Sequence, residues 1–212
     1  MDASDLIELL RARGASPRVV DAMADLPREE FVPRNVRGQA WEDHPLPIGF
    51  SQTISQPSLV ATMIDAIDIR AGARVLDVGT GSGYQAALLA SLGADVRSVE
   101  RIGDLADRAR QTIARVGWSV PVRCGDGSKG WPDFAPFDAI MVAAASEAIP
   151  PALVEQLVVP TDRPQRRGGR LILPLGGSRW GQNLVLVERT PTGYTRRDLG
   201  SVSFVPLVVD GR

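Results

Sequence analysis

A glycine-rich loop is the segment of the sequence with the clearest capacity for chemistry. It consists of Gly79, Thr80, Gly81, Ser82 and Gly83, and it lies between an apolar run and a helical pattern. Glycines let a backbone turn sharply and approach a ligand closely, and the N–H groups at the start of a helix face that ligand. The loop therefore predicts a cofactor site, and the alternative is a tight structural turn.

Two carboxylates flank this loop. Asp77 precedes it, and Glu100 ends the next apolar run, 21 residues beyond Gly79. A carboxylate at that place can accept hydrogen bonds from both ribose hydroxyls of an adenosine. A dinucleotide loop spaces its glycines G-x-G-x-x-G, whereas the third glycine here arrives one residue early. Asp77 also suits a cationic ammonium group better than a pyrophosphate, so both features favour S-adenosylmethionine over NAD.

A third carboxylate follows the next apolar run, in Gly125-Asp126-Gly127. Ligands of open α/β sheets bind along the carboxyl edge of the strands, where this segment is expected. We expect Asp126 to accept a hydrogen bond from an adenine amino group. The alternative is an Asp-Gly turn without a ligand.

Other catalytic constellations are missing from the sequence. His44 and Cys124 are the only histidine and the only cysteine, and no zinc-ligand spacing or G-x-S-x-G segment occurs, so we expect no metal. Methyl transfer to a carboxylate needs none of these groups. A carboxylic acid with a pKa of about 4 is already an anionic nucleophile at neutral pH. The enzyme must mainly align oxygen, methyl carbon and sulfur.

Composition indicates one globular domain. The chain has 212 residues, 44% of them hydrophobic, and a net charge of −1, which gives no overall attraction for nucleic acid or an acidic membrane. Its first residues are acidic, without the basic start and apolar run of a secretory signal. No apolar run approaches the roughly 20 residues of a membrane-spanning helix. We expect a cytoplasmic protein that binds neither nucleic acid nor membranes.

The elements that position these residues alternate between strand and helix. Apolar runs predict strands at 74–78, 95–100, 120–123 and 137–142, and helical patterns predict helices from Pro57 to Ile67 and at 84–92, 105–116 and 152–157. Two amphipathic helices precede them, starting near Leu6 and Val19, and an irregular segment covers 33–49. Alternation implies parallel strands with helices on both faces of the sheet.

The end of the chain predicts strands without intervening helices, at 170–173, 184–187 and 202–209, with a turn at Gly193. We therefore expect an α/β fold: a doubly wound, Rossmann-like sheet, mostly parallel with an antiparallel C-terminal end, plus N-terminal helices. Residues 1–212 form one domain. Within it, 1–56 is a helical and substrate-loop segment, 57–176 the cofactor-binding core, and 177–212 the C-terminal strands.

Residues 48–57, Ile-Gly-Phe-Ser-Gln-Thr-Ile-Ser-Gln-Pro, resemble the signature of the protein-L-isoaspartate O-methyltransferase family. The stretches at 27–33, 79–87, 98–102, 125–127, 135–140, 149–150, 168–171 and 202–207 are also similar to this family, in the same order. Together these matches are far more specific than one glycine loop.

The resemblance implies a class I methyltransferase fold and methylation of the free α-carboxylate of L-isoaspartyl residues in damaged proteins and peptides. The resulting ester collapses to a succinimide, which hydrolyses partly to normal aspartate. Ser55 matches the active-site serine of the family, whose hydroxyl would orient the substrate carboxylate; the alternative is that Ser55 caps the helix at Pro57. The resemblance adds Arg101 and Gly127 to the cofactor site, and places Ile54, Gln56, Val202, Phe204 and Val205 beside Ser55 at the substrate.

Some residues depart from the pattern of the family. Ser51 stands where bacterial members usually have glycine, Ala143 where they often have threonine, and the loop at 158–167 is longer than usual. His44 matches no obligatory position of the family, and we interpret it as a loop histidine with satisfied hydrogen bonds.

Three alternatives to the repair function remain open. A relative that methylates normal aspartate in one dedicated peptide is the nearest, and Ser51 and the long loop favour it. A non-catalytic cofactor-binding scaffold is less consistent with an intact Asp77, Glu100, Asp126 and Ser55. An NAD-dependent enzyme is the most distant. Both for the repair function and for the relative that methylates normal aspartate, the expected substrate is an isoaspartyl- or aspartyl-containing peptide or protein.

Overall fold

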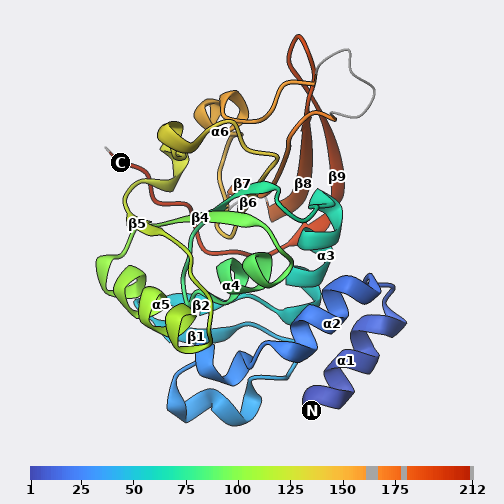
Figure 1. Ribbon diagram of the computed structural model, residues 1–212, viewed down its shortest axis with the longest axis vertical. Helices are drawn as coiled ribbons and strands as arrows, with labels where there is room; N and C mark the ends of the chain where they lie inside the picture. Colours follow the sequence, from blue (N-terminus) through green and yellow to red (C-terminus); the bar gives the residue numbers. More distant parts are fainter. Residues whose placement is uncertain (161–166, 178–180, 211–212) are drawn as a thin grey trace.

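The computed structural model describes residues 1–160, 167–177 and 181–210. A seven-stranded sheet with strand order β5-β4-β3-β6-β7-β8-β9 forms its centre (Figure 1). The strands are β3 (Arg74–Val78), β4 (Asp95–Glu100), β5 (Val122–Cys124), β6 (Ala139–Val142), β7 (Arg170–Gly177), β8 (Gly181–Arg189) and β9 (Tyr194–Val202). Neighbours from β5 to β7 pair in parallel, and β8 and β9 are antiparallel. The expected α/β sheet with an antiparallel C-terminal end is confirmed.

Helices cover both faces of this sheet. The helices α3 (Pro57–Ile67), α4 (Tyr84–Ser91) and α5 (Gly103–Arg115) lie on one face and α6 (Pro151–Glu155) on the other (Figure 1). Val75 of β3 packs into a hydrophobic core on the side of α3, α4 and α5, whereas Leu76 and Val78 pack into a second core on the side of α6. Strands buried on both faces read as continuous apolar runs, which is why the sequence located β3 and β4 at their observed bounds.

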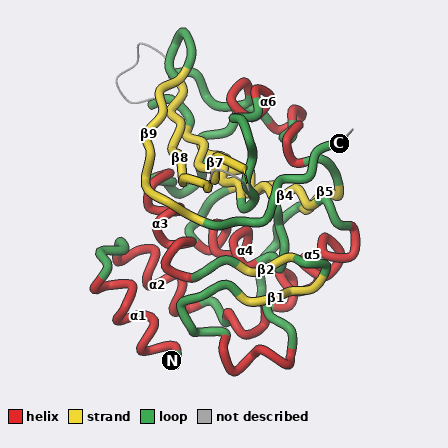
Figure 2. The backbone as a smooth tube through the Cα atoms, turned by 180° about the vertical axis from the view of Figure 1, so that it is seen from behind, coloured by secondary structure: helices red, strands yellow, loops and turns green. Residues whose placement is uncertain are grey.

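The two predicted N-terminal helices are present as α1 (Ala3–Ala12) and α2 (Pro17–Asp25). Asp2 caps α1 in a capping box with Asp5, and Ser16 caps α2. The 3-10 helices η1 (Arg28–Phe31) and η2 (Arg34–Gln39) follow, and then a hairpin of β1 (Leu46–Gly49) and β2 (Gln52–Ile54). The prediction that 33–49 is irregular is therefore wrong for η2 and for the last four residues, which form the strand β1. In Figure 2 the hairpin lies beside α5, below the sheet.

The predicted strand at 202–209 is also wrong. The last strand, β9, ends at Val202, and its residues 194–198 are exposed. A strand at the edge of a sheet with both faces in solvent has no apolar alternation, so the polar sequence of β9 did not indicate a strand. The turn at Gly193 is confirmed, because Thr190 N–H donates to the Gly193 carbonyl over 2.9 Å.

The apolar residues that suggested a strand belong to a different element, residues 203–210, which we call the strap. It runs from β9 across the edge of the sheet to the C-terminal end beside β5 (Figures 1 and 2). Ala145 N–H donates to the Val205 carbonyl over 2.8 Å, and Leu207 N–H donates to the Ala145 carbonyl over 2.7 Å. The strap therefore lies against the loop that follows β6.

Two other expectations concern the chain as a whole. In the described ranges, no helix is both long and apolar enough to cross a membrane. Residues 161–166 of the long loop at 158–167 lie outside the described residues. The division of the domain into segments 1–56, 57–176 and 177–212 stays a proposal.

The tip of the β1–β2 hairpin gives a prediction about stability. Gly49, Phe50 and Ser51 have φ values of 94°, 53° and 57°. A left-handed conformation costs a non-glycine residue about 1–2 kcal/mol, whereas glycine adopts it freely at a cost of about 0.5–1 kcal/mol in chain entropy. We expect Ser51→Gly to raise the free energy of unfolding by about 0.5–1 kcal/mol, measured by urea titration.

The control for this prediction is Ser119→Gly. Ser119 is exposed and does not have a positive φ, so only the entropic penalty of glycine applies and stability should fall. If Ser51→Gly is no more stable than wild type, the hairpin tip is not strained.

Candidate active site

The glycine loop follows β3 at the point where the order of the sheet reverses, with β4 on one side of β3 and β6 on the other. Such a switch point opens a crevice at the carboxyl ends of the strands. Gly79, Gly81 and Gly83 have φ values of 88°, 54° and 91°. A Cβ on Gly83 would lie 3.0 Å from Cγ1 of Ile113, and the loop therefore requires glycine both for its backbone and for space.

A pocket opens against this loop, and most of the residues expected to bind the cofactor line it. The expected residues in its wall are Ile54, Ser55, Gly79, Thr80, Gly81, Ser82, Glu100, Arg101, Gly127 and Val205. Asp77, Gly83 and Asp126 are not part of the wall. Ala143, Ala144 and the strap residues Pro206, Leu207 and Val208 line it as well, and the sequence did not single out these strap residues for the site.

Glu100 is held in this wall by two backbone hydrogen bonds. Its Oε2 accepts from Gly81 N–H over 2.7 Å, and its Oε1 accepts from Ile102 N–H over 2.9 Å. The side chain is only 6% exposed. Each carboxylate oxygen keeps a further lone pair for a ligand hydroxyl. Glu100 thus links the end of β4 to the glycine loop and offers a fixed acceptor to the pocket.

Asp77 lies beneath the loop rather than in the pocket. Its Oδ1 accepts from Gln85 Nε2 over 2.6 Å, and its Oδ2 accepts from Ser98 Oγ over 2.5 Å. The Ser98 hydroxyl in turn lies 2.5 Å from Thr80 Oγ1. The carboxylate is fully buried, and it braces the loop through Thr80 and the first turn of α4 through Gln85. Asp77 is fully buried and does not line the pocket, so the geometry favours this bracing role over the direct contact with an ammonium group that the sequence suggested.

The burial of Asp77 predicts a pH dependence of stability. Burial raises its pKa to about 6, against the lowering effect of the bonds from Ser98 and Gln85. An unfolded aspartate has a pKa of about 3.9, so the folded state binds the proton more tightly. The stabilisation from protonation is fully present below about pH 4 and is lost as the pH rises through about 6.

We therefore expect a difference between wild type and Asp77→Asn that changes with pH. From about pH 7 to about pH 5, the free energy of unfolding of wild type should rise relative to that of Asp77→Asn by about 1 kcal/mol. Urea titrations at both pH values measure this, and Asp133→Asn, at an exposed position, should follow wild type. A constant difference between wild type and Asp77→Asn would contradict a raised pKa.

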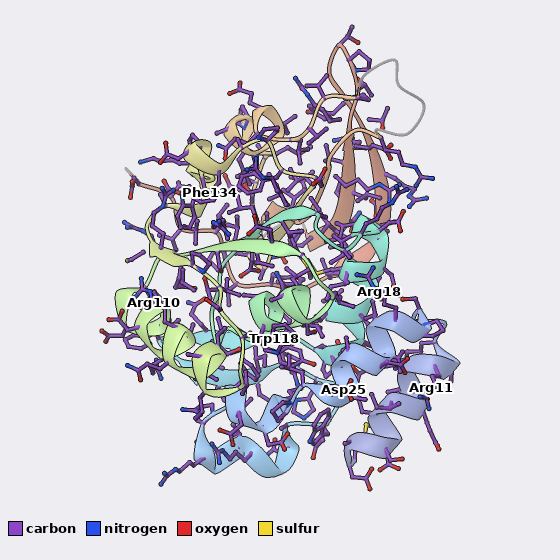
Figure 3. The ribbon with its side chains drawn as sticks, viewed as in Figure 1. Arg11, Arg18, Asp25, Arg110, Trp118 and Phe134 are labelled. Carbon is purple, nitrogen blue, oxygen red and sulfur yellow. The ribbon has the colours of Figure 1, made fainter. Side chains whose placement is uncertain are left out.

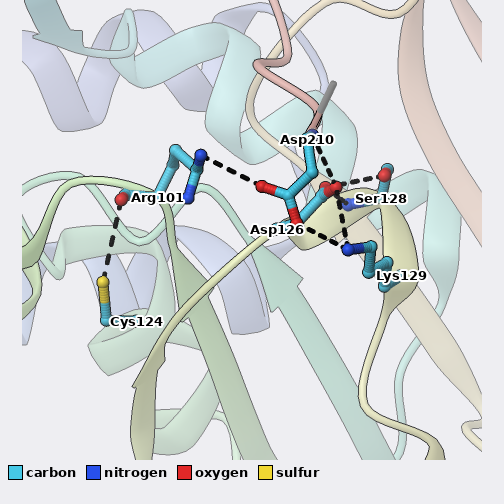
Figure 4. A network of polar contacts seen from close by, with 6 residues as sticks. All are labelled: Arg101, Cys124, Asp126, Ser128, Lys129 and Asp210. Carbon is cyan, nitrogen blue, oxygen red and sulfur yellow. Dashed lines mark hydrogen bonds and ion pairs between the residues drawn. The ribbon is translucent and has the colours of Figure 1, made fainter. Parts of the chain in front are cut away.

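Asp126 is engaged by its own neighbourhood (Figure 4). Its Oδ1 accepts from Ser128 N–H and Oγ, and its Oδ2 accepts from Asp210 N–H over 2.9 Å. Burial alone would raise the pKa of Asp126, but these hydrogen bonds outweigh it and the pKa is lowered. The carboxylate thus caps η3 (Gly127–Lys129) and holds the end of the strap, while the neighbouring Gly127 lines the pocket.

The strap is also held by its own carboxylate. Asp210 pairs with Arg101 over 3.0 Å and with Lys129 over 2.5 Å, so a cation that follows β4 and a cation of η3 both contact the strap (Figure 4). Arg101, expected at the cofactor, lines the pocket and makes this ion pair at once.

Ser55 lies where the pocket meets a second, more open groove. The groove contains three of the other residues expected at the substrate, Gln56, Val202 and Phe204, whereas Ile54 and Val205 line the pocket. Thr53 and Ser55 line both. In the part of the chain that the structure describes, the Ser55 hydroxyl makes no hydrogen bond.

The alternative role of Ser55 as a helix cap is wrong. The N-cap residue of α3 is Gln56, and its side chain makes no capping hydrogen bond. Asp43 acts from a distance instead, because its Oδ1 accepts from Ser58 N–H over 2.9 Å and its Oδ2 accepts from Gln56 Nε2 over 3.0 Å. The interpretation of His44 is confirmed: its ring nitrogens lie 3.0 Å from the Pro45 carbonyl and 2.8 Å from a Glu42 oxygen, and these bonds raise its pKa.

Comparisons with known proteins agree with this arrangement. The model of a family described as protein-L-isoaspartate(D-aspartate) O-methyltransferase matches residues 1–211. Protein-L-isoaspartate O-methyltransferase 2 of Marinobacter nauticus is 47% identical, with 98% of this chain and 96% of that protein covered. The protein-L-isoaspartate O-methyltransferase of Gloeobacter violaceus is 50% identical, with 94% and 95% covered.

Solved structures are similar as well. A protein-L-isoaspartate O-methyltransferase matches with a TM-score of 0.87 and 28% identity, over 97% of this chain and 65% of that one. A putative protein-L-isoaspartate O-methyltransferase from Plasmodium falciparum, in complex with S-adenosyl-L-homocysteine, matches with a TM-score of 0.80 over 98% of this chain and 99% of its own. At 24% identity, the second likeness concerns the fold.

Proposed function

The chain belongs to the protein-L-isoaspartate(D-aspartate) O-methyltransferase family, and we propose that it methylates the α-carboxylate of L-isoaspartyl residues in damaged proteins and peptides with S-adenosylmethionine. The observation that carries this proposal is the position of Ser55 between the enclosed pocket and the open groove. Methyl transfer needs a donor and an acceptor on either side of one contact point, and Ser55 stands at such a point. The names of the similar proteins agree with this substrate.

The residues of the pocket fit S-adenosylmethionine. A Cβ on Gly79 would lie 3.6 Å from Cβ of Ala143, which also lines the pocket, and Glu100 presents a carboxylate to it as a ribose diol requires. We assign the ribose to Glu100 and the remaining contacts to the backbone of residues 79–82 and of Gly127. The cofactor supplies an electrophilic methyl group on its sulfonium. Asp77 acts indirectly in this assignment, by bracing the loop through Ser98 and Gln85.

For Asp126 we propose an indirect role near the adenine in place of the expected hydrogen bond to its amino group. Its Oδ1 already accepts two hydrogen bonds, from Ser128 N–H and Oγ, and its Oδ2 accepts one from Asp210 N–H, which leaves one lone pair, on Oδ2. The side chain is 3% exposed and is not in the wall of the pocket. We therefore assign to Asp126 the placing of Gly127 and of the strap beside the adenine.

The substrate side requires little catalytic apparatus. The acceptor carboxylate is ionised at neutral pH, so no general base is needed, and the Ser55 hydroxyl is available to donate a hydrogen bond to it. Phe204 N–H donates to Gln182 Oε1 over 2.6 Å, and the Val205 carbonyl accepts from Ala145. We therefore assign side-chain contacts to Phe204, and backbone contacts with the peptide to Val202 and the free edge of β9.

The partner that follows from this assignment is a protein or peptide with an isoaspartyl residue. A peptide with normal aspartate belongs to the alternative reading. The cytoplasmic location and the expectation that nucleic acid and membranes are not partners stay predictions.

A direct test combines binding and turnover. Wild type should bind S-adenosylhomocysteine in a calorimeter and transfer methyl groups from S-adenosylmethionine to a short isoaspartyl peptide, counted by mass spectrometry. Binding without any transfer would favour the non-catalytic scaffold. Tight binding of NAD would overturn the cofactor assignment.

A further inference from the structure

Arg28 is an arginine in the core beneath Ser55. Its side chain is fully buried, and in the described residues it forms no ion pair with a carboxylate. Its Nε donates to the Ala40 carbonyl over 2.8 Å, and its Nη2 donates to the Ser55 carbonyl over 2.7 Å. Ser55 itself lies in neither a strand nor a helix, so this bond gives its backbone a partner from the core.

The same guanidinium contacts the cofactor side of the site. Its central carbon lies 4.7 Å from the centroid of the Tyr84 ring, which is the distance of a cation–π contact. Tyr84 is the first residue of α4, directly after the glycine loop, and it lines the pocket. Phe31 packs edge-on against the ring, with centroids 5.4 Å apart. The Arg28 side chain thus contacts both Ser55 and Tyr84, the first residue of α4, which follows the glycine loop.

A cation in this place is unfavourable for stability alone. Burial lowers the pKa of Arg28 from its ordinary value, while Tyr84 and Asp43 oppose that effect; the guanidinium stays charged because its ordinary pKa is so high. An apolar side chain in a core avoids the desolvation of a charge. The hydrogen bonds and the stacking of Arg28 are therefore the features that need an explanation.

We propose that Arg28 is a positioning residue for methyl transfer, which fixes the backbone of Ser55 relative to Tyr84 and so aligns the acceptor site with the cofactor loop. The inference rests on the proposed function of Ser55. A planar fork can donate to two carbonyls while its face covers a ring, and a lysine ammonium cannot. Transfer in a line is sensitive to such placement, since an error of about 1 Å can reduce a rate by about a hundredfold.

The first experiment compares Arg28→Lys with Arg18→Lys. Arg18, labelled in Figure 3, lies on α2 and also donates to two backbone carbonyls, those of Ile69 and Leu92, neither of which lines the pocket or the groove around Ser55. Both variants should lower the melting temperature. Only Arg28→Lys should lower kcat on an isoaspartyl peptide, by roughly tenfold, with the affinity for S-adenosylhomocysteine changed less than about threefold. An equal kcat in the two variants would overturn the proposal.

The second experiment is a double-mutant cycle with Ser55→Ala. If Arg28 acts by placing the Ser55 hydroxyl, Arg28→Lys should have little further effect on kcat once that hydroxyl is gone. Independent, multiplying effects would assign Arg28 a purely structural role. Rates are measured below the melting temperature of every variant, and Arg28→Gln replaces Arg28→Lys if the latter does not fold. A full rate in Ser55→Ala alone would instead contradict the proposed function of Ser55, so the two failures are distinguishable.

Discussion

Replacement of Glu100 by alanine is expected to weaken the binding of S-adenosylhomocysteine by about tenfold to a hundredfold. The estimate comes from the roughly 1.5–3 kcal/mol of hydrogen bonds to a charged acceptor, at about 1.4 kcal/mol for each factor of ten. The substitution also removes the acceptor of Gly81 N–H and Ile102 N–H. The loop then loses the contact that fixes its middle glycine, which places the loss at the upper end of this range.

Calorimetry of purified variants measures this effect, and two further variants define its cause. Glu188→Ala removes a carboxylate from β8 that pairs with Arg170 away from the pocket, and it should bind the ligand as wild type does. Glu100→Gln keeps one oxygen acceptor but turns an amide donor toward one of the two backbone N–H groups, so its loss should be intermediate. An unchanged affinity in a folded Glu100→Ala would remove Glu100 from the cofactor site.

The position of Glu100 could be predicted because it depends on regular elements. β3 and β4 are buried on both faces, so their apolar runs had clear ends. The carboxyl ends of adjacent parallel strands meet at one edge, which placed Glu100 beside the glycine loop without knowledge of side-chain positions. The same reasoning placed Gly127 at that edge, whereas Ser55 was located by the resemblance to the family.

The orientation of other carboxylates could not be predicted, because their partners are distant in the sequence. Asp126 accepts from Asp210, 84 residues away, and Asp43 reaches across 15 residues to cap α3. The strap was mistaken for a strand because it is apolar, and its apolar residues cover the pocket rather than alternate across a sheet. Arg28 had no signal of its own beyond its place in a segment similar to the family.

Discrimination between isoaspartyl and aspartyl peptides should also be large. In isoaspartate the main chain continues through the side-chain carbonyl, and the α-carboxylate is left on a short branch. In aspartate the carboxylate ends a methylene beside an ordinary backbone. A site that fixes the carboxylate at Ser55 and the flanking peptide along the edge of β9 can reach one geometry and not the other. Because backbone contacts ignore side chains, varied isoaspartyl sequences should be accepted.

We expect methylation of several unrelated isoaspartyl peptides at rates at least about a hundredfold above those of their aspartyl counterparts, since a carboxylate about 1 Å out of place loses about that factor. Ser55→Ala should lower the rate on isoaspartyl peptides by about tenfold to a hundredfold, the value of a hydrogen bond to a charged group. Ser91→Ala, which removes a hydroxyl bonded to the Leu88 carbonyl on α4, should keep the rate of wild type. Mass spectrometry counts the methyl groups on both peptide sets. Methylation confined to aspartate in one particular peptide would contradict the repair function. A single dedicated substrate has to be recognised by its side chains, whereas the repair function relies on backbone contacts in an open groove beside an edge strand.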